Sequence, residues 1–447
     1  MQAILAGMKA FELTATAAAA AIRSGELQSQ DLVRACLQQI SDVDGEIQAW
    51  THLDPEYALA QAAAADAALS EGKAPGALHG VPVGVKDIFD TRDMPTENGS
   101  VLHAGRAPAS DAEVVSRLRA AGAVILGKTV TTEFATYSPG KTRNPHNVEH
   151  TPGGSSSGSA AAVAACMVPV ALGSQTNGSV IRPAAYCGVH GFMPSHGWIS
   201  RAGVLKLSSI LDHVGVFTRS LEDAALLAEL LAGYDPKDPD TRPRATPPFA
   251  EILAQRPPTT PRLAWVKTPV WPQAEPDTRD VFGELVATLG EQAAEVTLPG
   301  AFDAAVDQHR LIMETDLAHN LATEFARGAD QLSDRLRGMI ESGNSHRAVD
   351  YNRAVSGIAE LNELLDRVFD EFDAILTPAA TGEAPKGLDA TGSPIFCTLW
   401  TLCGGPAITL PLLQGSNNLP IGVQLVGRHG DDARLLRTAR WLETQLR

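Results

Sequence analysis

With 447 residues, of which 44% are hydrophobic and 20% charged, the chain has the composition of an ordinary globular protein, which excludes disordered and collagen-like classes. Asp and Glu outnumber Lys and Arg by 52 to 36, so the formal net charge of -16 repels nucleic acids and anionic membrane surfaces. We therefore expect neither a nucleic acid nor a membrane as a partner.

The cysteines and the hydrophobic runs indicate in which cellular compartment the protein is expected. Five cysteines, an odd number without C-x-x-C spacing, predict buried thiols and neither a disulfide framework nor a zinc site. Lys9 and Glu12 precede the alanine run 17–21, which indicates a helix and not a secretion signal. No run approaches eighteen apolar residues, so we expect no transmembrane span and a cytoplasmic protein.

The first 78 residues predict a helical lead. Ser29 is the expected N-cap of a helix whose apolar residues recur at the spacing of one helix face: Leu32, Val33, Cys36, Leu37 and Ile40. This pattern indicates packing, not chemistry.

The pattern changes at His79. Residues 80–86 alternate as in a strand, with valines on one face and Pro82, Gly84 and Lys86 on the other, so Lys86 lies among small neighbours. Residues 111–121 follow as a helix that ends at Gly122, and then a short strand over 123–126. Alternation of strands and helices predicts an α/β fold.

Prolines divide the second half from the first. Seven prolines between 235 and 261 make regular structure improbable there, whereas helices are expected over 278–289 and 353–372 and strands over 374–378 and 419–427. We predict one domain over 1–447: a helical lead (1–78), a catalytic core (79–233), a Pro-rich loop (235–261), and a C-terminal portion (262–447) that completes the sheet and the substrate pocket.

Two glycine- and serine-rich segments, 151–159 and 173–179, flank a short alanine-rich helix. Loops with few side chains expose main-chain N–H groups, which can stabilise a developing oxyanion in acyl transfer. A flexible linker is the plain alternative, but the helix and the apolar strand 168–172 between the two segments disfavour it.

Three other kinds of site fit less well. Residues 154–158 match G-x-S-x-G, but the residues before them are polar and turn-like, not a strand. A phosphate loop would need a lysine after Gly158, which the sequence lacks. His190 and His196 belong to no catalytic motif and are expected to be structural.

Segments along nearly the whole chain resemble the amidase signature family. The motifs are GGSSSGSAA from Gly153, GSQTNGSVIRP from Gly173, GVPVGVKD from Gly80, GAVILGK from Gly122, EFA from Glu133 and PIGVQ from Pro420. The resemblance implies a large mixed central β-sheet with helices on both faces. It also implies hydrolysis of a carboxamide C–N bond without metal or cofactor, in an enzyme that is often a homodimer.

By this resemblance, Ser179 is the nucleophile, Ser155 the bridging serine in a cis peptide bond, and Lys86 the base. A lysine removes a proton only when neutral, so burial must lower its pKa. The main-chain N–H groups of Thr176, Asn177, Gly178 and Ser179 form the implied oxyanion hole, with Gly178 permitting a tight turn before the nucleophile.

The sequence departs from the family pattern near the nucleophile. Gln175 replaces an aspartate and Asn177 a glycine; an amide still forms hydrogen bonds, and asparagine tolerates a left-handed backbone. Ile181 stands where an arginine is usual and Arg182 follows, as in malonamidase-like members. Arg182 is therefore a candidate for binding a substrate carboxylate, with a structural ion pair as the equal alternative. Met193 replaces a common lysine without a consequence that we can argue.

The family pattern leaves other functions open. The chain could be the glutamine-hydrolysing A subunit of a tRNA-dependent amidotransferase, which would need tRNA and a second protein chain. A non-catalytic binding protein on the same scaffold is a further alternative, since fold alone does not guarantee activity. The sequence does not identify the substrate.

Overall fold

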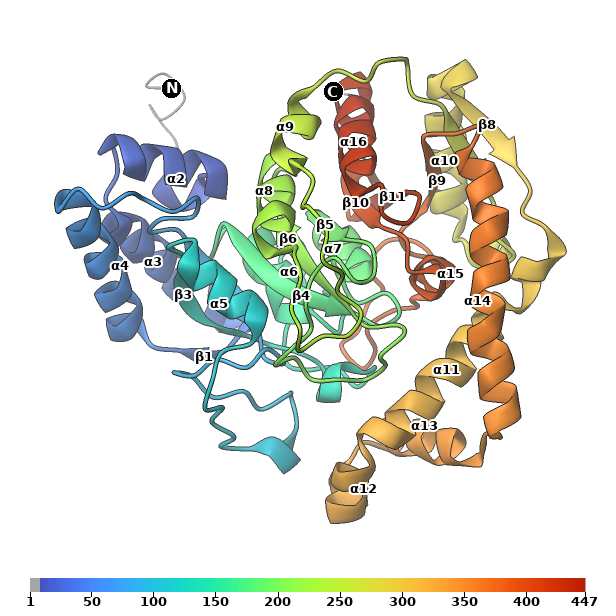
Figure 1. Ribbon diagram of the computed structural model, residues 1–447, viewed down its shortest axis with the longest axis horizontal. Helices are drawn as coiled ribbons and strands as arrows, with labels where there is room; N and C mark the ends of the chain where they lie inside the picture. Colours follow the sequence, from blue (N-terminus) through green and yellow to red (C-terminus); the bar gives the residue numbers. More distant parts are fainter. Residues whose placement is uncertain (1–8, 447) are drawn as a thin grey trace.

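The computed structural model describes residues 9–446, which form one mixed sheet covered by helices on both faces (Figure 1). Within these residues the sheet has 11 strands in the order β1-β3-β2-β4-β6-β5-β10-β11-β9-β7-β8. Pairing is parallel for β3–β2–β4 and for β9–β7–β8, and antiparallel elsewhere. The α/β fold class with a large mixed sheet is therefore confirmed.

The strands are mostly short and fully buried. They are β1 (Trp50–Leu53), β2 (Pro82–Lys86), β3 (Val124–Thr129), β4 (Val170–Gln175), β5 (His190–Met193), β6 (His213–Thr218), β7 (Leu263–Val266), β8 (Ala293–Val296), β9 (Ala374–Pro378), β10 (Ala407–Gln414) and β11 (Pro420–Val426).

The α-helices fall before, between and after these strands. They are α2 (Ala15–Ser24), α3 (Ser29–Ile47), α4 (Pro55–Ser70), α5 (Glu113–Ala120), α6 (Ser157–Ala164), α7 (Ile181–Cys187), α8 (Leu221–Leu231), α9 (Phe249–Ala254), α10 (Pro276–Leu289), α11 (Ala305–Asn320), α12 (Ala322–Gly328), α13 (Asp334–Ser345), α14 (Ala348–Phe369), α15 (Ile395–Cys403) and α16 (Asp432–Leu446).

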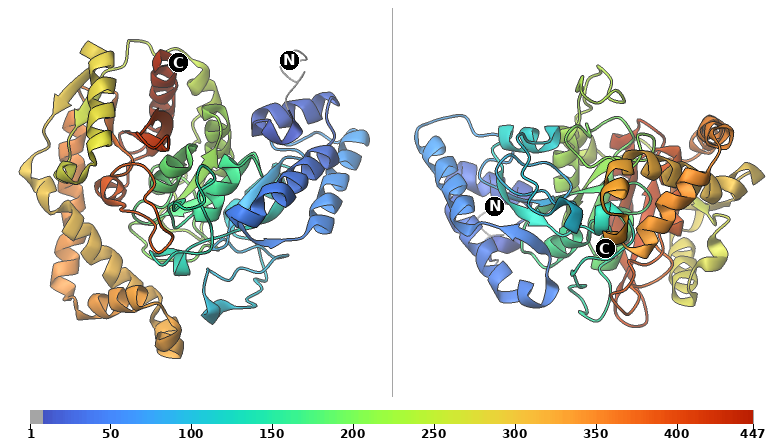
Figure 2. Two further views of the ribbon diagram at one scale, coloured as in Figure 1. Left: turned by 180° about the vertical axis from the view of Figure 1, so that it is seen from behind. Right: turned by 90° about the horizontal axis from the view of Figure 1, so that it is seen from below.

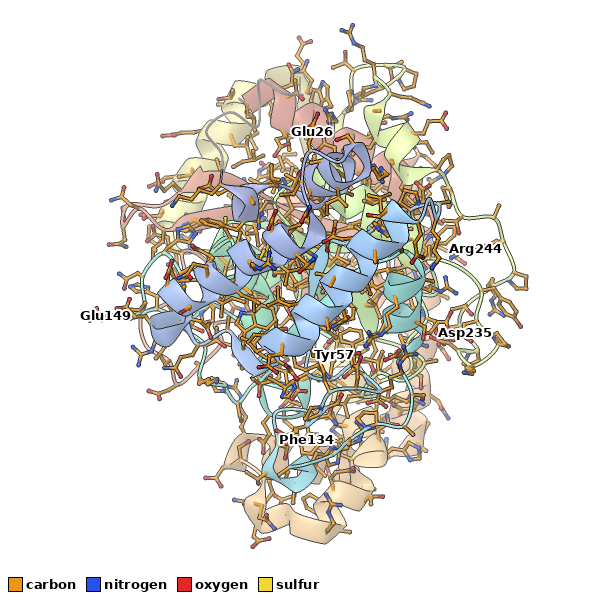
Figure 3. The ribbon with its side chains drawn as sticks, turned by 90° about the vertical axis from the view of Figure 1, so that its left-hand side faces the viewer. Glu26, Tyr57, Phe134, Glu149, Asp235 and Arg244 are labelled. Atoms are coloured by element: carbon orange, nitrogen blue, oxygen red, sulfur yellow. The ribbon has the colours of Figure 1, made fainter. Side chains whose placement is uncertain are left out.

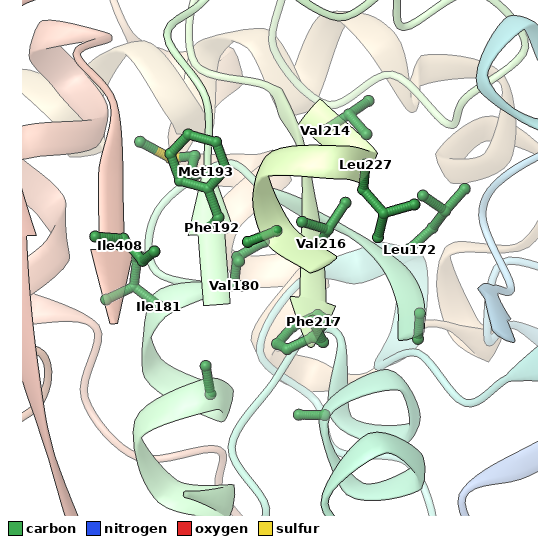
Figure 4. Close-up of a cluster of buried hydrophobic side chains, with 14 of the residues drawn as sticks. Leu172, Val180, Ile181, Phe192, Met193, Val214, Val216, Phe217, Leu227 and Ile408 are labelled. Carbon is green, nitrogen blue, oxygen red and sulfur yellow. The ribbon is translucent and has the colours of Figure 1, made fainter. Parts of the chain in front are cut away.

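Strands from the two halves of the chain meet in the middle of the sheet. β5 pairs with β10, where Phe192 lies opposite Ile408 and Met193 opposite Ala407. Close to this junction, Val180, Val214 and Phe217 belong to the continuous core drawn in Figure 4. Whether the chain unfolds as one domain, as the sequence predicts, stays a prediction.

The helices form three groups around the sheet. α3 and α4 lie side by side over the end that carries β1, with Tyr57 of α4 donating to Asp93 at 2.7 Å (Figure 3). α6 and α7 pack on the middle strands, and α8, α9 and α16 pack together on the opposite side (Figure 1). α11, α13 and α14 form a separate group at the other end of the molecule (Figures 1 and 2).

The elements that the sequence predicts lie close to their expected bounds, with small corrections. Ser29 is the first residue of α3 and not its N-cap; its hydroxyl donates to Gly80 O at 2.7 Å, which joins the helix to the chain before β2. The Pro-rich segment contains α9, because Phe249 and Leu253 are buried against α8 and α16. None of the helices formed by residues 9–446 combines the length and apolarity that a membrane crossing needs.

Candidate active site

The ends of two neighbouring parallel strands place Lys86 beside the serine-rich loops. β2 ends at Lys86 and β4 at Gln175, and Val85 of β2 lies opposite Leu172 of β4. Carboxyl ends of parallel strands meet at the same edge of a sheet, so the segments that follow both strands converge there. The sheet therefore joins segments that are almost 90 residues apart in the sequence.

Lys86 is fully buried and contacts two serine hydroxyl groups. Its Nζ lies 2.7 Å from Ser155 Oγ and 2.8 Å from Ser174 Oγ. Burial lowers the pKa of Lys86 well below its usual value, and the charge of Asp212 opposes this shift. A neutral amine can accept a proton from a neighbouring hydroxyl, so the environment is that of a base.

Ser155 follows a cis peptide bond, as the family resemblance implies. The bond joins Gly154 to Ser155, and α6 begins two residues later at Ser157. Gly154 packs closely on Thr391 and Thr132, since an added Cβ would lie 2.8 Å and 3.0 Å from their methyl carbons. Ser155 is 1% exposed, so its hydroxyl is shielded from bulk water.

Ser179 lies in the loop between β4 and α7. Within residues 9–446, the main-chain N–H groups of Thr176, Asn177, Gly178 and Ser179 have no protein acceptor, so they are free to bind a ligand oxygen. In the same part of the chain, Ser155 and Ser179 form no direct hydrogen bond. Catalytic hydrogen bonds are often long in the free enzyme and shorten when substrate binds.

The two substitutions in the nucleophile loop are both accommodated. Gln175 Oε1 accepts from the N–H groups of Val180 and Ile181 at 2.8 and 3.0 Å, and its Nε2 donates to Thr401 Oγ1 at 2.9 Å. A carboxylate could accept from the two N–H groups but could not donate to Thr401. The amide thus joins the start of α7 to α15.

Asn177 is held by its side chain. Its Nδ2 donates to Tyr137 at 2.8 Å, and its Oδ1 accepts from Thr398 of α15 at 2.7 Å. The chain bends at residues 176–178 and turns at 179–180, as expected, but neither Asn177 nor Gly178 has a left-handed backbone. Gly178 is needed for another reason, because an added Cβ would lie 2.9 Å from Pro394 and 3.2 Å from Cys397.

Arg182 is fully buried in α7 and points to main-chain oxygens. Its Nη1 donates to Gly392 O at 2.8 Å and its Nη2 to Gly154 O at 2.6 Å. The second bond ties the helix after the nucleophile to the peptide before Ser155. Within residues 9–446 these two nitrogens bond only main-chain oxygens, and the side chain is fully buried, so the contacts favour a structural use of the guanidinium.

A narrow cavity opens at Ser179 and is lined mainly by apolar groups. Helices α11 and α13 supply Met313, Leu317 and Met339, which lie in the region after Pro261 where the sequence places the acyl pocket. No charged side chain lines it; the remaining lining residues are Ala135, Thr136, Tyr137, Thr176, Asn177 and Leu207. A second cavity shares Ala135, Thr176 and Leu207 with the first and reaches Ser174.

Four residues at the site were not identified from the sequence. Ser174 contacts Lys86, and Asp212 accepts from Thr176 Oγ1 at 2.7 Å. His309 of α11 donates to Thr176 O at 2.9 Å and is neutral, because burial lowers its pKa to about 4. Tyr137 is the fourth. Only Ser174 carries a signal in the sequence, as a hydroxyl residue at the carboxyl end of a buried strand.

The alternative sites do not assemble. No strand leads directly into Gly154, since residues 130–153 form none, so the G-x-S-x-G match lacks its structural context. His190 contacts Glu443 of α16 at 3.0 Å, and His196 contacts Arg201 at 2.9 Å. Within residues 9–446, no group of three or more His, Cys, Asp or Glu side chains could hold a metal ion.

Comparison with known proteins shows the family of the chain. Residues 31–436 match the family described as Amidase. The chain belongs to the amidase family. Among curated amidase relatives, the putative amidase AmiD of Mycobacterium bovis is 36% identical, covering 95% of this chain and 92% of that protein. The A subunit of glutamyl-tRNA(Gln) amidotransferase from Chloroflexus aggregans is 35% identical, covering 95% of this chain and 94% of that protein.

Solved structures of other amidases are also similar. The peptide amidase from Stenotrophomonas maltophilia has a TM-score of 0.86 and 28% identity, and the match covers 97% of each chain. A 6-aminohexanoate cyclic dimer hydrolase has a TM-score of 0.85 and 27% identity, with 98% of each chain covered. The family and these neighbours identify this amidase as a hydrolase of carbon–nitrogen bonds.

Proposed function

We propose that the protein hydrolyses the C–N bond of a small carboxamide through an acyl-enzyme on Ser179, with Ser155 and Lys86 as the proton relay. The observation that carries this proposal is the buried contact of 2.7 Å between Lys86 Nζ and Ser155 Oγ. Because burial lowers the pKa of Lys86, its amine can accept the proton that Ser155 passes on from Ser179.

In acylation, Ser179 Oγ attacks the amide carbon while its proton moves to Ser155, and the Ser155 proton moves to Lys86. The free N–H groups of residues 176–179 stabilise the oxyanion, and each such donor typically lowers the barrier by about 3 kcal/mol. When the C–N bond breaks, Lys86 returns a proton through Ser155 to the leaving nitrogen. Water then hydrolyses the ester by the same relay and releases the carboxylic acid.

A second function has support from the relatives named as A subunits of an amidotransferase, which are as similar to the chain as the amidases are. In that case the same acyl-enzyme would form from glutamine, and the released ammonia would pass to a second protein chain. Glutaminase activity that increases when such a chain is added would favour this function.

We favour a free-standing, cytoplasmic enzyme that forms a homodimer, and size-exclusion chromatography tests the oligomeric state.

The test measures ammonia release from short acid amides, aryl amides, ureas and glutamine. Ser179→Ala should abolish release and also abolish labelling by a fluorophosphonate probe, because the probe needs the activated hydroxyl. Ser157→Ala is the matched control: Ser157 is a buried serine of α6 that donates to Val130 O at 3.3 Å, and the variant should keep labelling. Hydrolysis that survives in Ser179→Ala would contradict the proposal.

A further inference from the structure

The cavity at Ser179 lacks a charged lining, but a cation lies at its edge. Arg335 of α13 is exposed, and its guanidinium carbon is 4.9 Å from the centre of the Tyr137 ring. Tyr137 lines the cavity and accepts a hydrogen bond from Asn177. One aromatic ring thus separates the guanidinium from the loop that carries the nucleophile.

The direction of α13 brings Arg335 to the same side as the cavity. Met339 lines the cavity and follows Arg335 by four residues, so the two side chains lie on one face of the helix. α13 packs on α11, which supplies Met313 and Leu317 to the same wall (Figure 1). Arg335 itself does not line the cavity, but it contacts Tyr137 and lies one helical turn from Met339, both of which do.

Arg335 has no acidic partner in the described chain. Its neighbour Asp334 forms an ion pair with Arg337. Glu314 is the acid whose charge contributes to the raised pKa of Tyr137. Its carboxylate accepts a hydrogen bond from Ser342 at 2.6 Å and lies 3.7 Å from His346. A guanidinium that stacks on an aromatic ring keeps its N–H groups free to bind a carboxylate with two parallel hydrogen bonds.

Arg182, the arginine that the sequence suggested for this role, does not meet this need. Both terminal nitrogens of Arg182 donate to main-chain carbonyl groups. The net charge of -16 also means that an anionic substrate is repelled by the protein as a whole, so its binding depends on a local cation.

We propose that Arg335 binds a carboxylate at the far end of the acyl group, so that the preferred substrates are monoamides of short dicarboxylic acids. This inference rests on the proposed amidase function of the same site. The amide carbon lies at Ser179, the methylene chain contacts Met313, Leu317 and Met339, and the carboxylate pairs with Arg335.

The test compares the monoamides of succinic, glutaric and adipic acid with the neutral amides in which a methyl group replaces the carboxylate. The parent enzyme should show a kcat/KM at least tenfold higher for one or more of the acid monoamides. Arg335→Met should lower this preference at least tenfold, mainly through KM, and Arg335→Lys should retain part of it because a lysine lacks the planar fork. Arg337→Met, which removes a paired arginine of the same helix, should leave the preference intact.

Two outcomes overturn the inference alone: a parent enzyme that prefers the neutral amides, or an unchanged preference in Arg335→Met. Labelling of Ser179 by a fluorophosphonate probe shows that the site of each variant is folded. If the parent hydrolyses no amide and Ser179 is not labelled, the proposed function itself is overturned, and the two failures are therefore distinguishable.

Discussion

The guanidinium of Arg182 illustrates how much a single buried side chain can contribute to an active site. It donates to Gly392 O and Gly154 O, so it joins three segments: α7 after the nucleophile, the peptide before Ser155, and the chain before α15. Leaving a buried acceptor without its donor typically costs about 1–3 kcal/mol. These contacts fix the peptide before Ser155 relative to the helix that follows Ser179.

We predict that Arg182→Met lowers kcat at least tenfold for neutral and anionic amides alike, with little change in KM. The reason is that the variant loosens the peptide before Ser155 without removing a contact to the substrate. Steady-state kinetics with one acid monoamide and its neutral counterpart measure both parameters. A loss confined to the acid monoamide would instead support the carboxylate-binding role that the sequence suggested for Arg182.

For single residues, motifs predict the proposed reacting side chains but not the side chains that support the surrounding loop. Lys86, Ser155 and Ser179 belong to segments with recognisable local patterns. Tyr137 and His309 do not, because their contacts with Asn177 and Thr176 depend on how distant segments pack. The catalytic roles of Lys86, Ser155 and Ser179 stay predictions.

Among the elements, α11 and α15 support the nucleophile loop from two sides. Thr398 and Thr401 of α15 bind Asn177, and His309 of α11 binds Thr176. No motif in the sequence indicates that these two helices support the site. Two threonines three residues apart in the apolar segment IFCTLWTLC do suggest polar contacts on one face of α15. Sequence patterns predicted α3, α14 and β2, whose apolar residues recur at helix or strand spacing, but they did not predict β5, β6 or β10.

His309 gives the molecule a measurable pH dependence through α11. Its pKa is lowered to about 4 from 6.5, so between these values the unfolded chain binds a proton that the folded protein does not. The contribution of neutral His309 to the free energy of unfolding is therefore fully present above pH 6.5. It is lost as the pH falls towards 4, and the loss reaches about 3 kcal/mol.

We predict that His309→Gln reduces the loss of stability between pH 7.5 and pH 4.5 by about 2 kcal/mol, since a glutamine amide can donate to Thr176 O without titrating. Urea unfolding at the two pH values measures this difference. His319→Gln, a change at an exposed histidine of the same helix, should leave the difference as it is in the parent. An equal loss in His309→Gln and the parent would contradict this account of His309.

Across the whole molecule, the sheet joins two halves of the chain that prolines separate in the sequence. The pattern of residues indicated that the C-terminal portion could complete the sheet, but it could not show which strands become neighbours. That depends on the antiparallel pairing of β5 with β10, in which Thr409 lies opposite Gly191. Contacts of Ser195 and Trp198 with Asp432 of α16 add to the same junction.

If this junction makes the chain one cooperative unit, both halves should unfold together in urea. Hydrogen exchange followed by mass spectrometry should then give one midpoint for peptides of β2 and β4 and for peptides of β7 and β9. Thr409→Val removes the hydrogen bond of 3.0 Å from Thr409 Oγ1 to Ile181 O at the junction and should lower both midpoints equally, by about 1 kcal/mol in unfolding free energy. Separate midpoints in the parent, or a shift of only one in the variant, would show that the halves are independent domains, because a local change affects distant elements only through cooperative unfolding.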